Sequence, residues 1–192
     1  SYVSSTHTVT WMNQAGTSAY ETDTGVVYGS QPSYDGTAPT KTQTAQYAYT
    51  FTGWSTSPNS ESGTVASDLP AVTGDSIYYA AFSKTARSYM VSVLAGTGAA
   101  TAKVNDKSSD TYLYNPTSTH SFDLSATPAS GYDADSLTWT ASDPGKVTIS
   151  GNRLTVKANQ TGNITLTASY TKSVPTEAEY RVEHYLQNLA GD

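Results

Sequence analysis

The sequence predicts a mostly β protein made of short strands, with little helix. Ser, Thr, Gly and Tyr are abundant, and only 14% of the residues are charged, which argues against a chain kept disordered by its charge. Apolar and polar residues alternate over short runs, and Gly, Pro and Asp-Gly signals separate these runs. With 192 residues, of which 36% are hydrophobic, the chain is long enough for one or two modest domains with small cores.

The most aromatic run, from Tyr47 to Trp54, predicts the strand around which the first part of the chain is organised. Tyr47, Tyr49 and Phe51 fall at period two and therefore project from one face of an extended strand. Gly53 is suited to a β-bulge that turns Trp54 inward. Because large aromatic residues at strand spacing dominate the cores of small β domains, this run indicates a fold and no particular chemistry.

Four strands are expected in this first part, over residues 6–13, 19–27, 47–55 and 77–83. Between the second and the third, Pro32, Asp35-Gly36 and Pro39 mark turns, with at most a short helix after residue 40. Residues 69–74 resemble a sortase anchoring signal, but they contain one residue too many and lack the apolar segment and basic tail of such a signal. We interpret them as a loop.

Short motifs follow one another along this part: His7 to Asn13, Gly16-Thr17, Tyr20 to Asp23, Val27 to Gly29, Pro32 to Gly36, Pro39 to Lys41, Tyr49 to Trp54, Val72 to Asp75 and Ile77 to Phe82. In order and in spacing they resemble the internalin B-repeat family, also called the Listeria–Bacteroides repeat, over roughly residues 6 to 86. The resemblance implies that residues 1–86 form a compact β-grasp-like module, of a kind strung in arrays on bacterial surface proteins.

A short polar stretch at residues 84–88 is interpreted as the boundary and linker between two domains. Further short alternating runs follow, centred on Tyr89 to Val93, Val104, Phe122 to Ala126, Leu137 to Ala141, Val147 to Ile149, Leu154 to Val156 and Ile164 to Tyr170. Short strands separated by turns at this spacing favour a β-sandwich. The stretch from 103 to 115 is interpreted as a loop whose place in the sandwich stays open.

The second half of this part carries its own motifs: Leu137 to Asp143, Lys146 to Asn152, Leu154 to Ala158 and Thr161 to Ala168. They resemble the second half of a bacterial immunoglobulin-like (Big) domain, although Asn163 stands where that family often has Thr or Ser. The resemblance covers roughly residues 88 to 172 and is strongest after residue 121. It implies an Ig-like β-sandwich over residues 87–173.

Residues 174–192 begin a new pattern, in which Tyr180, Val182, His184 and Leu186 alternate with polar residues. We interpret them as a linker and the truncated first strand of a further repeat, which would become ordered only by adding to an exposed sheet edge. The chain is thus expected to be a part of a longer repeat protein.

The residues that carry chemistry show no catalytic pattern. The chain has no cysteine, which excludes disulfides and thiol chemistry. His7, His120 and His184 lie in three different segments without metal-ligand spacing, and no Ser is surrounded by a Gly-x-Ser-x-Gly elbow. We therefore nominate no catalytic, cofactor-binding or metal-ligating residue, and the ligand-binding residues stay open.

Three weaker alternatives are kept beside this interpretation. Gly96-Thr-Gly98 fits a turn better than a phosphate cradle, because the third glycine and the following helix are missing. A weak surface calcium site formed by Asp133, Asp135 and Asp143 stays open. The alternative is that these aspartates only form turns. An intramolecular isopeptide bond would need a Lys, an Asn and an acid, and no such triplet is assigned.

The charge of the chain is acidic and uneven. The formal net charge is −6, and residues 1–86 alone contain two lysines against six acidic residues. Because there is no clustered basic stripe, nucleic acid is not an expected partner. No apolar run approaches the roughly 18 to 20 residues that span a bilayer, so no membrane insertion is expected in this fragment.

Two functions of different class remain. In the first, the chain is a non-catalytic extracellular stalk or adhesion segment of a Gram-positive-type cell-surface or cell-wall repeat protein, monomeric within a longer modular chain, with an unknown protein or glycan ligand. In the alternative, the modules are carbohydrate-binding or spacer accessories of a secreted glycan-active enzyme. Exposed faces of Tyr78, Tyr112, Tyr114 or Tyr132 would then stack on sugars. Neither function makes this segment itself an enzyme.

Overall fold

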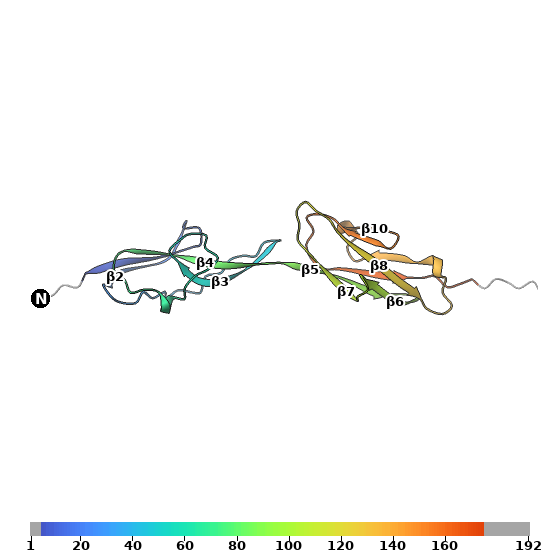
Figure 1. Cartoon of the computed structure of the whole chain (residues 1–192), viewed down its shortest axis with the longest axis horizontal. Helices are drawn as coiled ribbons and strands as arrows, with labels where there is room; N and C mark the ends of the chain where they lie inside the picture. Colours follow the sequence, from blue (N-terminus) through green and yellow to red (C-terminus); the bar gives the residue numbers. More distant parts are fainter. Residues whose placement is uncertain (1–4, 175–192) are drawn as a thin grey trace, which may run out of the picture.

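A computed structural model describes residues 5–174 of the chain. The expected linker and further strand at residues 175–192 lie outside the described residues. Within the described range the chain forms twelve strands and three single-turn 3₁₀ helices, with no α-helix, which confirms the expectation of a mostly β protein with little helix. Figure 1 shows two groups of strands that follow each other along the long axis of the molecule.

The first group is one four-stranded sheet. Its strands are β1 (Thr6–Met12), β2 (Ala19–Val27), β3 (Tyr47–Ser55) and β4 (Ser76–Ala86), in the spatial order β2-β1-β4-β3. The central strands β1 and β4 are parallel, and the two outer pairs are antiparallel, which is the arrangement of a β-grasp sheet. Residues 31–44 are irregular and contain no helix.

The bulge expected at Gly53 is present in β3. The register of β3 with β4 shifts between Phe51 and Gly53, and Gly53 has a φ of +122°, a conformation that L side chains rarely adopt. Beyond the bulge, Trp54 is only 3% exposed. Two backbone hydrogen bonds of 2.8 Å join Trp54 and Thr64, each residue donating one N–H to the other's carbonyl, and hold this turn of the strand in place.

The core of the first part is largely aromatic. Trp11 packs edge-on against Trp54, with ring centroids 4.7 Å apart, and Tyr34 lies against both rings. Trp11 is completely buried, and its indole N–H donates to a carboxylate oxygen of Asp23 at 2.8 Å. The buried polar atom is thus satisfied, as a buried Trp requires.

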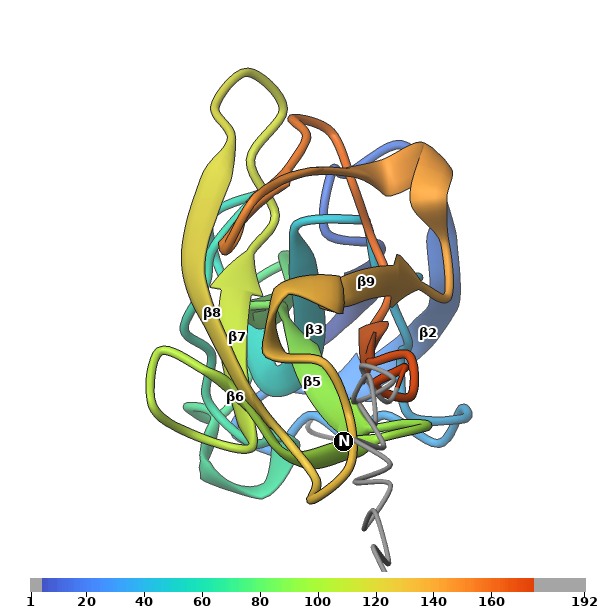
Figure 2. The same ribbon diagram turned by 90° about the vertical axis from the view of Figure 1, so that its right-hand side faces the viewer.

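The second group is a sandwich of two four-stranded sheets, ordered β10-β11-β8-β6 and β7-β5-β12-β9. Figure 2 views the molecule end-on, with this part facing the viewer. The strands are β5 (Ser88–Ala95), β6 (Ala99–Val104), β7 (Ser109–Leu113), β8 (His120–Pro128), β9 (Thr138–Ala141), β10 (Val147–Ser150), β11 (Arg153–Val156) and β12 (Ile164–Ser169). Alternate residues of both sheets form one core that is separate from the first, as the sandwich expectation requires. The 3₁₀ helices η1 (Ala66–Asp68), η2 (Ala134–Ser136) and η3 (Pro144–Lys146) lie in connections between strands.

The interpretation of residues 103–115 as a loop was wrong, because β6 continues to Val104 and β7 lies within the stretch. Val104 and Lys107 exchange backbone hydrogen bonds across a tight turn, and both central residues, Asn105 and Asp106, have positive φ. Asn and Asp are favoured at turn positions with positive φ. The Asn105-Asp106 pair was therefore the signal for a tight turn between β6 and β7, which lie in different sheets, and sequence reasoning missed it.

The interpretation of residues 84–88 as a linker was also wrong. β4 continues through Lys84 and Thr85 to Ala86, paired with β3, and β5 begins at Ser88. Only Arg87 stands between the two strands. The stretch is polar because the end of the sheet is exposed there, while its backbone is still paired. Figure 1 shows β4 passing almost directly into β5.

Candidate functional site

The histidines do not form a site. In β1, Nδ1 of His7 lies 3.7 Å from a carboxylate oxygen of Asp75, and in β8 the ring of His120 lies against that of Tyr112. In both rings Nε2 is buried without a hydrogen-bond partner. His184 lies outside the described residues. Among residues 5–174, no three His, Asp or Glu side chains gather as a metal site would require.

The aspartates considered for calcium take part in local turns. Asp133 accepts a hydrogen bond from the N–H of Asp135 at 3.0 Å and so caps η2. Asp143 forms a 2.8 Å ion pair with Lys146 across η3. These contacts are those of turn-forming residues, and the carboxylates do not converge on one point.

Two of the four tyrosines considered for sugar stacking are buried, so the expectation that their faces are exposed was wrong. Tyr78 is 4% exposed and packs against Trp11, with ring centroids 5.2 Å apart. Tyr112 is 3% exposed, and its hydroxyl donates to the carbonyl of Gly162 at 2.8 Å. Burial raises the pKa of Tyr112. Both side chains point into the core from their strands. Alternation alone does not show which face of a strand is inward when both faces carry polar neighbours.

The other two tyrosines are half-buried and hold loops. The hydroxyl of Tyr114 donates to the side-chain oxygen of Asn159 at 2.6 Å. Tyr132 covers Gly98 so closely that a Cβ added there would lie 2.2 Å from the ring. The four tyrosines therefore do not form a common platform.

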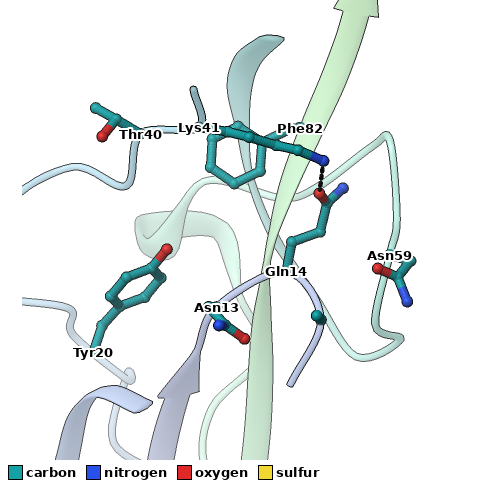
Figure 3. Close-up of a pocket in the computed structure, with 8 residues that line it drawn as sticks. Asn13, Gln14, Tyr20, Thr40, Lys41, Asn59 and Phe82 are labelled. Atoms are coloured by element: carbon teal, nitrogen blue, oxygen red, sulfur yellow. Dashed lines mark hydrogen bonds between the residues drawn. The ribbon is translucent and has the colours of Figure 1, made fainter. Parts of the chain in front are cut away.

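A shallow groove in the first part is the best-formed candidate for binding, and we call it the Lys41 groove. It consists of two adjoining hollows of about 260 and 230 Å³. Both are lined by Gln14, Lys41, Asn59 and Phe82. The first hollow also contains Asn13, Ala15, Tyr20 and Thr40, and the second Tyr47, Tyr49, Glu61 and Lys84. Figure 3 shows the first hollow.

Lys41 reaches across this groove. Its Nζ donates to the side-chain oxygen of Gln14 at 2.6 Å and lies 4.2 Å from the centre of the Tyr49 ring, within cation–π distance. Gln14 is held in turn, because its Nε2 donates to the carbonyl of Ser60 at 3.0 Å. Figure 3 shows Lys41 directed toward Gln14, with Tyr20 on the other side of the hollow.

Lys84 lies at the other end of the groove and is neutralised there. Its ammonium forms an ion pair with Glu61 and lies 5.5 Å from the centre of the Tyr47 ring. The hydrogen bond to Glu61, followed by the attraction of its charge, raises the pKa of Lys84. Lys41 and Lys84 are the only basic residues among the first 86, so all the positive side-chain charge of this part lies in one groove. Sequence reasoning missed it because the two lysines lie far apart in the chain.

The junction between the two parts has its own set of contacts, which we call the junction clasp. Three consecutive carbonyls before β3 accept hydrogen bonds from the start of the second part. That of Thr44 accepts from the guanidinium of Arg87 at 2.7 Å, that of Ala45 from the hydroxyl of Tyr89 at 2.9 Å, and that of Gln46 from the backbone N–H of Arg87 at 2.8 Å. The Arg87 guanidinium also lies 5.3 Å from the centre of the Tyr89 ring.

The described side chains thus offer hydrogen bonds, aromatic faces and, in the Lys41 groove, a cation without a carboxylate partner. These are means of binding and of holding parts together. No helix in the described part of the chain is long and apolar enough to cross a membrane.

Comparison with known proteins adds little to these structural observations. No family model matches the chain, and no curated protein matches it. A solved structure described as Streptococcal High Identity Repeats in Tandem (SHIRT) domains 3-4 from cell surface protein is 13% identical, and the alignment covers 87% of this chain and 99% of that one. Its TM-score is 0.32, which is too low to establish a shared fold.

Proposed function

We propose that the chain is a non-catalytic extracellular spacer segment of a bacterial cell-surface or cell-wall repeat protein of the Gram-positive type. In this proposal a B-repeat-like β-grasp module, residues 1–86, is followed by a Big-like sandwich, residues 87–173. The segment holds an adhesive region away from the wall as a monomeric part of a longer chain, and its partners are proteins or glycans at the cell surface.

The junction clasp is the observation that carries this proposal. A spacer must keep its modules extended, and here one residue, Arg87, separates the two strands that enter and leave the junction. Tyr89 belongs to the core of the sandwich and also donates to the loop of the preceding sheet. Each hydrogen bond of this kind contributes about 0.5 to 1.5 kcal/mol. Three of them resist bending far better than a flexible linker would.

The proposal predicts that the two modules fold independently. Each part has its own sheets and its own cluster of buried residues, so fragments 1–87 and 87–174 should both give cooperative thermal unfolding and dispersed amide spectra. Recovery of either fragment only as unfolded or aggregated material would overturn the division at residues 86 and 87.

Small-angle X-ray scattering of the chain and of the two fragments tests the spacer function itself. For an extended spacer, the maximum dimension of the chain should be close to the sum of the maximum dimensions of the two fragments. A markedly smaller dimension would mean that the modules fold back on each other, and the spacer function would then be wrong.

The alternative, an accessory of a glycan-active enzyme, rested on exposed faces of Tyr78, Tyr112, Tyr114 and Tyr132. The burial of the first two and the loop contacts of the others remove that support.

A further inference from the structure

We propose that the Lys41 groove binds a saccharide that carries a negatively charged group, with a sugar ring against Tyr20 and the charged group at Lys41. The site lies within the first module and does not depend on the spacer function. Charge, exposed side chains and shape each contribute to the inference.

The charge at Lys41 is uncompensated. Of the two basic residues among the first 86, Lys84 is paired with Glu61, whereas Lys41 is hydrogen-bonded to the neutral amide of Gln14. In the described part of the chain, no carboxylate lies within ion-pair distance of Lys41. Gln14 and the Tyr49 ring hold the ammonium in the groove, so an anion that enters meets a positioned charge.

The neighbouring hollow offers what a sugar ring needs. Tyr20 is 44% exposed on the edge strand β2 and lines the hollow with its ring, so an aromatic face is available for stacking. The side chains of Thr40 and Asn59 line the same hollow and make no hydrogen bond within the described residues. An aromatic face beside unengaged hydroxyl and amide groups suits a polyhydroxylated ring. The volume of about 260 Å³ is slightly below the roughly 300 to 1,000 Å³ of small-ligand sites.

The acidic character of the first module means that any preference for an anion must come from the groove itself. Residues 1–86 have a net charge of −4, counted from two lysines and six acidic residues, so the module as a whole repels anions. Attraction must therefore come from direct contact at Lys41, and a polyanion without a ring to stack on Tyr20 gains only part of the interaction. This reasoning favours an anionic saccharide over an acidic peptide, and over a neutral sugar.

Titration of the whole chain followed by amide NMR shifts tests the proposal. The probes are a hyaluronate hexasaccharide, which carries carboxylates, a sulfated dextran oligosaccharide, neutral maltohexaose and a hexaglutamate peptide. We expect at least one of the two anionic saccharides to shift the signals of Tyr20, Lys41 and Asn59. Its Kd should be at least about tenfold below those of maltohexaose and hexaglutamate, a difference of about 1.4 kcal/mol. The carboxylated and sulfated probes identify which anionic group is preferred.

Matched variants locate the binding. Lys41→Gln and Tyr20→Ala should each weaken binding of the preferred saccharide at least about fivefold, because one removes the charge and the other the ring. Tyr20→Phe keeps the ring and should bind like the unmodified chain. Lys103→Gln removes one positive charge from β6 of the other module and should also leave binding unchanged.

Three results would overturn the proposal. They are an absence of shifts with both anionic saccharides, equal binding of maltohexaose or hexaglutamate, and equal affinity of Lys41→Gln and Lys103→Gln. None of these results affects the maximum dimension measured by scattering, so failure here is distinguishable from failure of the spacer function.

Discussion

Replacing Trp54 with Ala is expected to lower the free energy of unfolding of the first module by about 3 to 5 kcal/mol, the usual range for emptying a large aromatic site. Trp54 is 3% exposed and contacts the rings of Trp11, Tyr34 and Phe51, so its removal leaves a cavity in the centre of the aromatic core. Small domains are only marginally stable, and the variant module should be close to unfolding. Native-state hydrogen exchange of the β1 and β4 amides measures the loss.

Val65→Ala is the matched control, because Val65 belongs to the same module and is 53% exposed. It should change the stability by no more than about 0.5 kcal/mol. A Trp54→Ala variant whose β1 and β4 amides remain as protected as those of the control would show that Trp54 does not support the core.

Replacing Gly53 with Ala is expected to destabilise the same module by about 2 to 3 kcal/mol through the backbone. Gly53 has a φ of +122°, and an added Cβ would lie 2.5 Å from the carbonyl oxygen of Thr64. The added Cβ would also lie 3.0 Å from the carbonyl carbon of Gly63, the residue before Thr64, so the two backbone segments cannot move apart without breaking the hydrogen bonds between Trp54 and Thr64. Urea unfolding followed by the fluorescence of the tryptophans in this module measures the effect.

Gly74→Ala provides the comparison. A Cβ at Gly74 would meet nothing within 4 Å, and Gly74 does not have a positive φ. This variant should be as stable as the unmodified chain within about 0.5 kcal/mol. Equal stability of Gly53→Ala and Gly74→Ala would contradict the account of the bulge.

The strands of the first sheet were predictable because their signals are local. Alternation located β1 to β3 to within a residue or two, and a glycine between Phe51 and Trp54 indicated the bulge. Edge strand β7 was missed because only Tyr112 of its five residues is buried, so it lacks the alternation of a strand that covers a core. The end of β4 was missed for the same reason, since exposed paired residues look like a linker.

The candidate sites were not predictable, because they depend on contacts between distant segments. Lys41 and Lys84 come together only when β4 pairs with β3, and the clasp requires the chain before β3 to meet Arg87 and Tyr89. Parallel pairing of β1 with β4 places the first and last strands of the first module side by side, which no local pattern specifies. Residue type alone also gave the wrong exposure for Tyr78.

The distance distribution between spin labels on either side of the junction tests the central claim most directly. Because the chain contains no cysteine, Thr50→Cys in β3 and Ser121→Cys in β8 give unique labelling sites, both exposed. The account predicts one narrow distance distribution for the labelled chain with an unmodified junction, and the same for the surface control Arg153→Ala. It predicts a clearly broader distribution in Arg87→Ala combined with Tyr89→Phe, which removes two of the three clasp hydrogen bonds. A broad distribution in the unmodified chain, or an unchanged one in the double variant, would contradict the claim that the clasp holds the modules as an extended spacer.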